Sequence, residues 1–297
     1  MIQKRWLALS LMLGVALILG VACGDDDDDD DDTDVTADDD DAADDDDDAG
    51  GAIDISGVSE LEDGTLSVLI NAPYPPLENF GPGGETDIIG FTPDLAAAMA
   101  EKLGVEVEMI QTGFDAIIEE LNAGDGDVVM SSMTINPERD EQVDFVPYLS
   151  VGTGIAVAAG NPEGIATPED LCGLAVSVQE GTIQEDELQA LNGDQCADNQ
   201  IELVILADQG LVTQEIAEGN VDAMMADLPV ILDAAATFPD AVEATDYNED
   251  VAPYGIAYVT DSPLGDALQA AFDAVVEDGT YQSLLEEYGL EDAALVE

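Results

Sequence analysis

Segments with the period of a β-strand alternate with segments with the period of an α-helix from Thr65 to the end of this chain. The apolar residues of the strand-like segments alternate or form short runs, at residues 66–70, 105–109, 127–131, 174–178, 201–206, 221–225 and 255–259. The helix-like segments lie between them, at residues 93–103, 115–122, 210–218, 228–236, 264–276 and 281–288. A strand followed by a helix, repeated along the chain, favours parallel sheets joined by right-handed crossovers. The sequence therefore predicts an α/β fold.

Three predicted helices begin with a polar residue followed by proline. The pairs are Thr92-Pro93, Asn136-Pro137 and Thr167-Pro168. Thr and Asn side chains cap helix N-termini, and proline suits the first helical position. We therefore expect a helix start at each pair.

The charge balance is extremely acidic. The 297 residues include 69 Asp and Glu, 4 Lys and Arg and no His, for a formal charge of -65. Of the acidic residues, 18 lie between Asp25 and Asp48, which leaves 51 after Gly50 against only Lys102 and Arg139. Such a chain repels nucleic-acid phosphates and anionic lipids, and its own charges oppose compaction at low salt. We expect a protein adapted to high salt, which screens this repulsion.

The N-terminus has the pattern of an export signal. Lys4 and Arg5 precede an apolar run from Trp6 to Ala22, so residues 1–22 are predicted to be a signal peptide. The run ends at Cys23 in a Gly-Val-Ala-Cys sequence that resembles a bacterial lipobox, in which the cysteine carries a lipid. An uncleaved membrane anchor is the alternative. Both place the rest of the chain outside the cytoplasm.

Residues 23–50 are mostly Asp, Ala, Thr and Gly and offer almost nothing to bury. Such a segment is predicted to be a disordered, self-repelling tether. A calcium site is the alternative, but an unbroken aspartate run lacks the spaced ligands and the turn glycine of a calcium loop. We therefore expect no metal site.

Two further cysteines, Cys172 and Cys196, remain in this exported chain. An even number of cysteines outside the cytoplasm favours a disulfide, and two buried free thiols are the alternative.

Arg139 is the only arginine beyond Arg5. It falls in the first turn of the short helix that Asn136 is predicted to cap, where the helix dipole and a planar guanidinium both attract a carboxylate. Ser131, Ser132 and Thr134 add donors at the end of a strand, the place where open α/β sheets bind ligands. The alternative is a surface arginine that forms solvated pairs with the acidic residues around it.

Four stretches of the chain carry a resemblance to a known family. They are GFTPDLAAAMAEKLG at 90–104, FDAIIEELNAGDGDVVMSSMTINPERDEQVDF at 114–145, LCGLAVSVQEGTIQEDEL at 171–188 and GNVDAMMADLPV at 219–230. In order and spacing, across about residues 64–290, they resemble the substrate-binding proteins of ABC importers for polar amino acids. The resemblance implies a two-lobed periplasmic-binding-protein fold, in which each lobe is a mostly parallel sheet flanked by helices and two hinge crossings join the lobes.

The resemblance also implies boundaries. Lobe 1 would comprise residues 58–150 and 261–297, lobe 2 residues 155–248, and the hinge residues 151–154 and 249–260. The expected disulfide then lies within lobe 2.

Site residues follow from the same resemblance. The α-carboxylate of an amino acid would be held by Ser132, Thr134, Arg139 and Thr182, and its α-ammonium by Asp227. Tyr74 and Phe114 would sandwich the ligand, and Asn71 would meet its side chain. Each residue has a simpler explanation: Thr182 with Glu185 as a capping box, Asp227 as a helix cap, Tyr74 as part of a proline-rich turn and Phe114 as core.

The predicted function is capture of a small zwitterion, in the first place an amino acid, outside the cell for delivery to the membrane permease of an ABC importer. No cofactor is expected. Because the only second cation is Lys102, which is expected on a solvent-facing helix, a neutral polar amino acid, a basic one or a zwitterionic compatible solute is favoured over glutamate or aspartate. The alternative is a dehydratase of the prephenate or arogenate type on the same fold. No His and no activated Cys is available for such catalysis, so we expect a binding protein and not an enzyme.

Overall fold

The structure is a computed structural model that describes residues 53–295, and these residues belong to one compact unit. The predicted signal peptide, the lipidation site Cys23 and the tether lie outside the described residues. Among residues 53–295, no helix is both long and apolar enough to cross a membrane.

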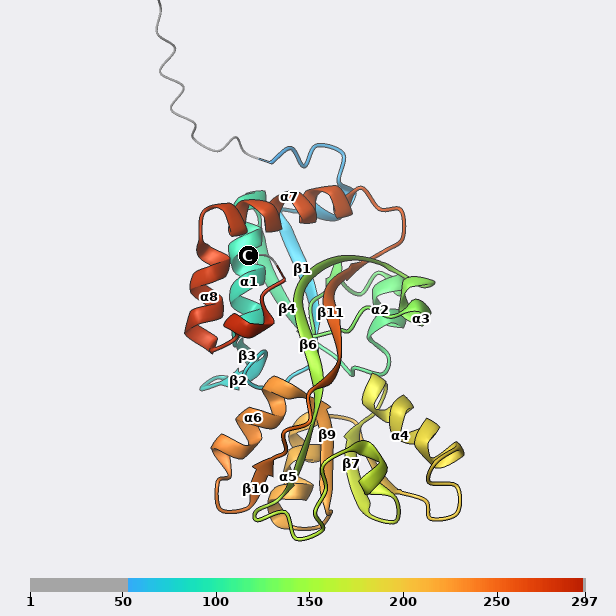
Figure 1. Cartoon of the computed structure of the whole chain (residues 1–297). Coiled ribbons are helices and arrows are strands. Elements are labelled where there is room, and N and C mark those ends of the chain that lie inside the picture. Colours follow the sequence, from blue (N-terminus) through green and yellow to red (C-terminus); the bar gives the residue numbers. More distant parts are fainter. Residues whose placement is uncertain (1–52, 296–297) are drawn as a thin grey trace, which may run out of the picture. The chain divides into compact units, whose positions relative to one another are not determined.

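The elements alternate as the sequence predicts (Figure 1). The strands are β1 (Thr65–Ile70), β2 (Asn79–Gly81), β3 (Gly84–Ile89), β4 (Glu106–Gln111), β5 (Val128–Val129), β6 (Asp144–Ala158), β7 (Ala175–Gln179), β8 (Glu202–Leu206), β9 (Ala223–Asp227), β10 (Val242–Ala244) and β11 (Glu249–Tyr258). The α-helices are α1 (Phe91–Leu103), α2 (Ile117–Ala123), α3 (Pro137–Asp140), α4 (Ile183–Gly193), α5 (Gln209–Glu218), α6 (Leu228–Thr237), α7 (Leu264–Glu277) and α8 (Thr280–Tyr288). Short 3₁₀ helices are η1 (Ser59–Leu61), η2 (Pro168–Leu171) and η3 (Glu291–Ala293).

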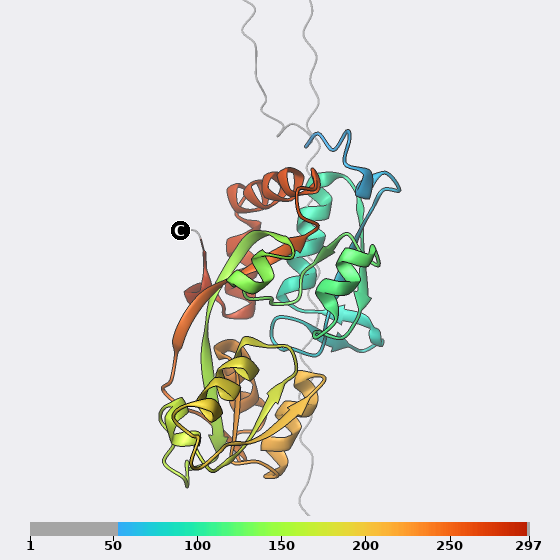
Figure 2. The ribbon, with the colours of Figure 1, turned by 90° about the vertical axis from the view of Figure 1, so that its right-hand side faces the viewer.

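Two lobes share one continuous sheet in the order β4-β1-β5-β11-β6-β9-β7-β8, with β10 paired to β6. The first lobe contains the parallel strands β4, β1 and β5, the hairpin β2-β3, and α1, α2, α3, α7 and α8. The second lobe contains the parallel strands β8, β7 and β9 with α4, α5 and α6. The long strands β6 and β11 run between the lobes and pair antiparallel (Figure 2). The α/β two-lobed fold is confirmed.

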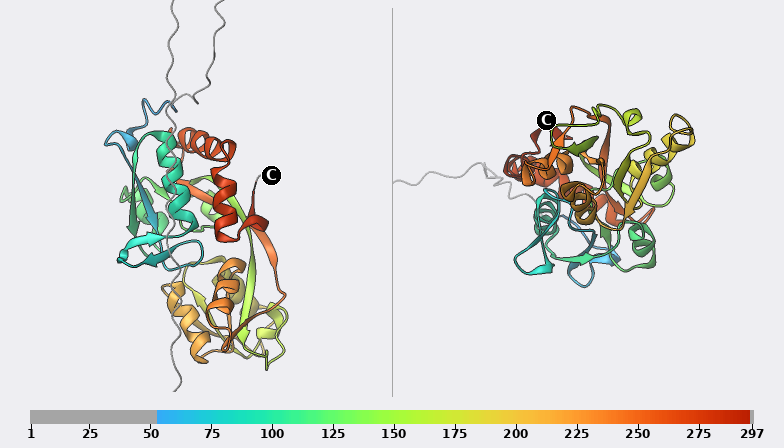
Figure 3. Two further views of the ribbon diagram at one scale, coloured as in Figure 1. Left: turned by 90° about the vertical axis from the view of Figure 1, so that its left-hand side faces the viewer. Right: turned by 90° about the horizontal axis from the view of Figure 1, so that it is seen from below.

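Burial explains the strand positions. Every residue of β9 is buried, because β6 and β7 flank this strand within the sheet and helices α5 and α6 pack against it. In the first lobe, α1, α7 and α8 lie together on one side (Figure 3, left). Aromatic rings fill the space beneath them: Phe91 stacks near Tyr148, and Tyr281 donates to the Tyr148 carbonyl at 2.6 Å.

One predicted helix start is wrong. Helix α1 begins at Phe91 with Gly90 in the capping position, so Thr92 lies inside the first turn. Its hydroxyl does not cap the helix but donates to Glu78 at 2.8 Å. Asn136 does cap α3, by accepting from the Arg139 N–H at 2.9 Å.

The disulfide between Cys172 and Cys196 is confirmed, with 5.1 Å between the Cα atoms. It joins the segment before β7 to the segment after α4; Cys196 belongs to the apolar core of the second lobe, and the partly buried Cys172 packs against that core.

The segment 151–154 lies inside β6, opposite β11. Gly152 allows the chain following β10 to approach closely, because a Cβ there would lie 2.1 Å from Asn248 Oδ1. The register between β6 and β11 shifts twice, between Glu249 and Ala252 and between Tyr254 and Gly255.

Candidate functional site

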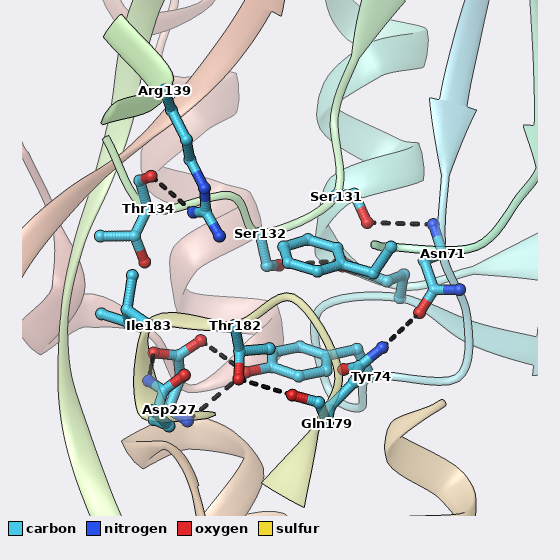
Figure 4. Close-up of a pocket in the computed structure, with 13 residues that line it drawn as sticks. Asn71, Tyr74, Ser131, Ser132, Thr134, Arg139, Gln179, Thr182, Ile183 and Asp227 are labelled. Carbon is cyan, nitrogen blue, oxygen red and sulfur yellow. Dashed lines mark hydrogen bonds between the residues drawn. The ribbon is translucent and has the colours of Figure 1, made fainter. Parts of the chain in front are cut away.

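All nine ligand-binding residues predicted from the sequence line one small pocket between the two lobes (Figure 4). These are Asn71, Tyr74, Phe114, Ser131, Ser132, Thr134, Arg139, Thr182 and Asp227. Four more residues that were not predicted from the sequence also line the pocket: Glu78, Gln179, Ile183 and Gln184. The cavity volume is only about 10 Å³, close to the minimum that one water molecule requires. An amino acid can therefore enter only if the walls move apart.

Arg139 is held in the pocket wall by main-chain carbonyls. Its Nη1 donates to the Thr134 carbonyl at 2.7 Å and its Nη2 to the Gly181 carbonyl at 3.0 Å, and the guanidinium carbon lies 5.4 Å from the centre of the Phe114 ring. The residue is 9% exposed. This burial contradicts the alternative of a solvated surface arginine. Burial lowers the pKa of Arg139, but an arginine remains protonated in proteins.

No carboxylate of the described residues pairs directly with Arg139. The ion pair in this part of the chain joins Lys102 and Asp278, and both side chains are about one-third exposed. Lys102 thus lies at the surface, as expected, where it pairs with the residue that follows α7. The charge of Arg139 remains available to an anion that reaches the pocket.

Asp227 supplies a buried carboxyl group from the second lobe. It stands before Leu228 in the capping position of α6, yet its side chain caps nothing. Instead Oδ1 accepts from Gln184 Nε2 at 2.9 Å, and Oδ2 accepts from the Tyr74 hydroxyl. Burial raises the pKa of Asp227. The alternative of a plain helix cap is wrong, because the carboxyl faces the pocket.

The first turn of α4 also faces the pocket, and its capping differs from the predicted box. Thr182 Oγ1 accepts from the Glu185 N–H at 3.2 Å and donates to the Gln179 carbonyl at 2.8 Å. The Glu185 carboxylate, however, accepts from the Gly181 N–H at 2.8 Å and not from Thr182. The reciprocal half of the capping box is therefore shifted by one residue.

Three pairs of residues are hydrogen-bonded across the pocket, from one lobe to the other. Besides Arg139 with Gly181 and Tyr74 with Asp227, Gln179 Nε2 donates to Asn71 Oδ1 at 2.8 Å. Arg139 and Asp227 lie on one side of the pocket, and Asn71 lies on the opposite side (Figure 4). The lobes are thus closed on each other through pocket residues themselves.

Asn71 is fixed at both ends of its amide. Its Nδ2 donates to the Thr112 carbonyl at 2.6 Å while Oδ1 accepts from Gln179. Its main-chain N–H donates to Ser131 Oγ at 3.0 Å, which connects β1 to the segment after β5. The Ser131 hydroxyl therefore positions a neighbouring strand end.

Glu78 is the most consequential residue that the sequence analysis missed. It is fully buried, and its Oε2 accepts from Thr92 Oγ1 at 2.8 Å and from Ser132 Oγ at 3.0 Å. Burial raises the pKa of Glu78 to about 8. Its place after the proline-rich Tyr74–Leu77 turn was the one available signal, and nothing in the sequence separates it from the other acidic residues.

Comparison with known proteins places this geometry in a family. The profile described as "Bacterial extracellular solute-binding proteins, family 3" matches residues 66–291. An arginine-binding protein of Corynebacterium glutamicum is 34% identical over 237 residues, 79% of this chain and 77% of that protein. The L-cystine-binding protein of Escherichia coli is 32% identical over 232 residues, 76% of this chain and 83% of that protein.

A solved structure is also similar to this chain in both sequence and fold. An ancestral arginine-binding protein bound to arginine has 35% sequence identity and a TM-score of 0.70, with 76% of this chain and 98% of that chain covered. The two relatives and this solved structure are all named as binding proteins, which favours a binding protein over the dehydratase alternative. The chain belongs to the bacterial extracellular solute-binding proteins of family 3.

Proposed function

We propose that this protein captures an α-amino acid outside the cell and delivers it to the permease of an ABC importer. The observation that carries the proposal is that two groups of opposite charge type line one pocket without pairing with each other: buried Arg139 from the first lobe and buried Asp227 from the second. A zwitterion needs a fixed cation and a fixed anion. The relatives named above bind arginine and cystine, which are α-amino acids.

Each pocket group has a role in this proposal. The ligand α-carboxylate accepts from Arg139 and from the hydroxyls of Thr134 and Thr182, while the α-ammonium donates to Asp227. Charge-assisted hydrogen bonds of this kind stabilise a complex by roughly 1.5–3 kcal/mol each, so three or four suffice for micromolar affinity, about -8 kcal/mol. Tyr74 and Phe114 provide apolar contact. Because the groups come from two lobes, ligand stabilises the closed form.

Titration calorimetry with a panel of amino acids, at several salt concentrations, tests the proposal. We expect a neutral or basic amino acid to bind, and Asp227→Asn to weaken binding strongly because the counter-charge of the α-ammonium is lost. Tight binding of glutamate would overturn the expected exclusion of acidic ligands. If no α-amino acid binds the wild type, the proposed function is wrong.

We also propose that Cys23 carries a lipid that holds the protein at the outer face of the membrane, and that the protein is adapted to high salt. The lipobox-like sequence and the net charge of -65 support these two proposals. Expression of the full chain with Cys23→Ser, followed by fractionation, tests the first: the variant should leave the membrane fraction, whereas an uncleaved anchor would keep it there.

A further inference from the structure

Glu78 carries an acceptor atom that the described residues leave without a donor. The side chain is 0% exposed and lines the pocket. Thr92 and Ser132 both donate to Oε2, whereas Oε1 has no hydrogen-bond partner in residues 53–295. Buried polar atoms are almost always paired, so an unpaired one in a pocket wall points to a group supplied from outside.

The charges that line the pocket do not balance for a zwitterion. One cation, Arg139, faces two acidic side chains, Asp227 and Glu78. The α-carboxylate of an amino acid compensates Arg139, and the α-ammonium compensates Asp227. Glu78 is left over, so an ionised pocket calls for one further positive charge on the ligand.

The position of Glu78 agrees with contact to a ligand side chain. Glu78 bonds to Ser132, which lies between Arg139 and Asn71 in Figure 4. A ligand whose α-groups occupy Arg139 and Asp227 extends its side chain away from them, past Ser132 and toward Asn71.

We propose that Glu78 is the recognition site for a cationic side chain, so that the preferred ligand is a basic amino acid with a guanidinium or ammonium group. This inference rests on the proposed capture of an α-amino acid and narrows it to one chemical class. The unpaired Oε1 accepts an N–H from the ligand, while Thr92 and Ser132 hold Oε2 in place.

A proton is exchanged when such a ligand binds. Because burial raises the pKa of Glu78 to about 8, the free protein holds this carboxyl protonated at pH 7. A bound cation favours the ionised form, so binding releases a proton, and affinity for a basic amino acid rises with pH up to about 8. The other titratable groups beside Glu78 are Asp227, Tyr74 and Tyr148. Burial raises the pKa of both tyrosines, which therefore stay neutral across this range.

Arginine and citrulline provide the test, because they differ in side-chain charge but hardly in shape. Titration calorimetry at pH 6, 7, 8 and 9 would measure both ligands on the wild type, on Glu78→Gln, and on Glu108→Gln as a control at an exposed position of β4. We expect the wild type to prefer arginine at pH 8 by at least about tenfold. Arginine affinity should rise by up to tenfold per pH unit below pH 8. Glu78→Gln should abolish both effects, and Glu108→Gln should keep them.

Citrulline separates the roles of the two carboxyl groups. Citrulline binds Asp227 through the same α-ammonium group as arginine does, so a pH dependence of affinity that both ligands show reports the titration of Asp227. Only the additional pH dependence of arginine affinity reports Glu78. Equal affinity of the wild type for arginine and citrulline would overturn the inference, and this comparison needs no variant. An equal loss of affinity for arginine and for citrulline in a folded Glu78→Gln variant would also overturn the inference. If citrulline or glutamine binds but arginine does not, the proposed function stands and only this inference fails.

Discussion

The Arg139 guanidinium donates to the Gly181 carbonyl at 3.0 Å, although the two residues belong to different lobes. One side chain therefore contributes to lobe closure and carries the positive charge proposed to hold the ligand carboxylate. Its second hydrogen bond, to Thr134, keeps the planar group oriented from within the first lobe.

Arg139→Lys is expected to weaken amino-acid binding by at least about 30-fold, equivalent to roughly 2 kcal/mol. A lysine ammonium cannot reproduce the planar fork that contacts two carbonyls and a carboxylate together. Calorimetry with a ligand of the wild type measures the loss. Lys102→Gln is the matched control, because Lys102 pairs with Asp278 at the surface and should leave affinity unchanged. Equal affinities of Arg139→Lys and wild type would remove Arg139 from the ligand site.

Gly181→Ala should lower affinity by preventing full closure of the lobes. Gly181 has φ +78°, and a Cβ there would lie 2.9 Å from Asp115 Cα in the first lobe. Gly219→Ala is the control that separates backbone strain from a steric clash. Gly219 also has a positive φ, +74°, but a Cβ there would meet no atom within 4 Å. Both variants should lose stability, but only Gly181→Ala should lose affinity in calorimetry. Similar affinities for the two variants would contradict a close approach at Gly181.

Replacing both Cys172 and Cys196 by serine should destabilise the second lobe and leave the pocket chemistry intact. A disulfide that closes a loop of about 25 residues stabilises by roughly 3 kcal/mol in the chain-entropy model. For a protein of this size that corresponds to a melting temperature lower by about 6–12 °C. Calorimetric scans measure the shift, and ligand affinity at 20 °C should be retained. A large loss of affinity in the folded variant would show that the disulfide also shapes the pocket.

Salt should raise the melting temperature of the mature protein. The 51 acidic residues after Gly50 face two cations, so repulsion between surface carboxylates opposes folding, and molar salt shortens its range to about 3 Å. Thermal unfolding in 0.1 M and 2 M sodium chloride tests this expectation. A melting temperature that stays constant would contradict adaptation to high salt.

Without ligand, Glu78 should make the protein less stable as pH rises. The folded state holds the pKa of Glu78 at about 8, against 4.5 for an ordinary glutamate, so the unfolded state binds fewer protons between these two pH values. Stability from this group is present below pH 4.5, declines from there to about pH 8 and stays low above. The melting temperature of Glu78→Gln should therefore fall less than that of the wild type between pH 6 and pH 8.5. Parallel curves would show that Glu78 titrates normally.

Local patterns predicted the fold well because each strand and helix carries its own signal. The Asn136-Pro137 pair predicted the start of α3, and Asn136 does cap this helix. The apolar run that includes Met224 and Met225 predicted a strand, and both residues lie in the fully buried strand β9. The start of α1 could not be predicted, because Thr92 fits the local capping pattern but its hydroxyl donates to Glu78, 14 positions away in the sequence. Tertiary contacts outweighed the local preference.

The site was predictable only where composition or family motifs singled a residue out. Arg139 stood out as a rare cation, and the motifs located the serines and Asp227. Glu78, Gln179 and Gln184 gained their positions from contacts across 14 to 108 residues of sequence, as with Glu78 and Thr92, Gln179 and Asn71, or Gln184 and Thr153. No periodicity encodes such pairings, and an acidic residue has no distinction in a chain so rich in them.

The antiparallel pair of β6 and β11 has a mechanical consequence. Because this two-stranded ribbon is the sheet's passage from one lobe to the other, rotation of the lobes must twist or bend it. Its two register shifts, beside Ala252 and Gly255, interrupt the regular ladder near the middle of the molecule. Irregular points in a ladder concentrate local bending. We therefore expect the bending that accompanies a rotation of the lobes to concentrate at these two irregular points of the ribbon.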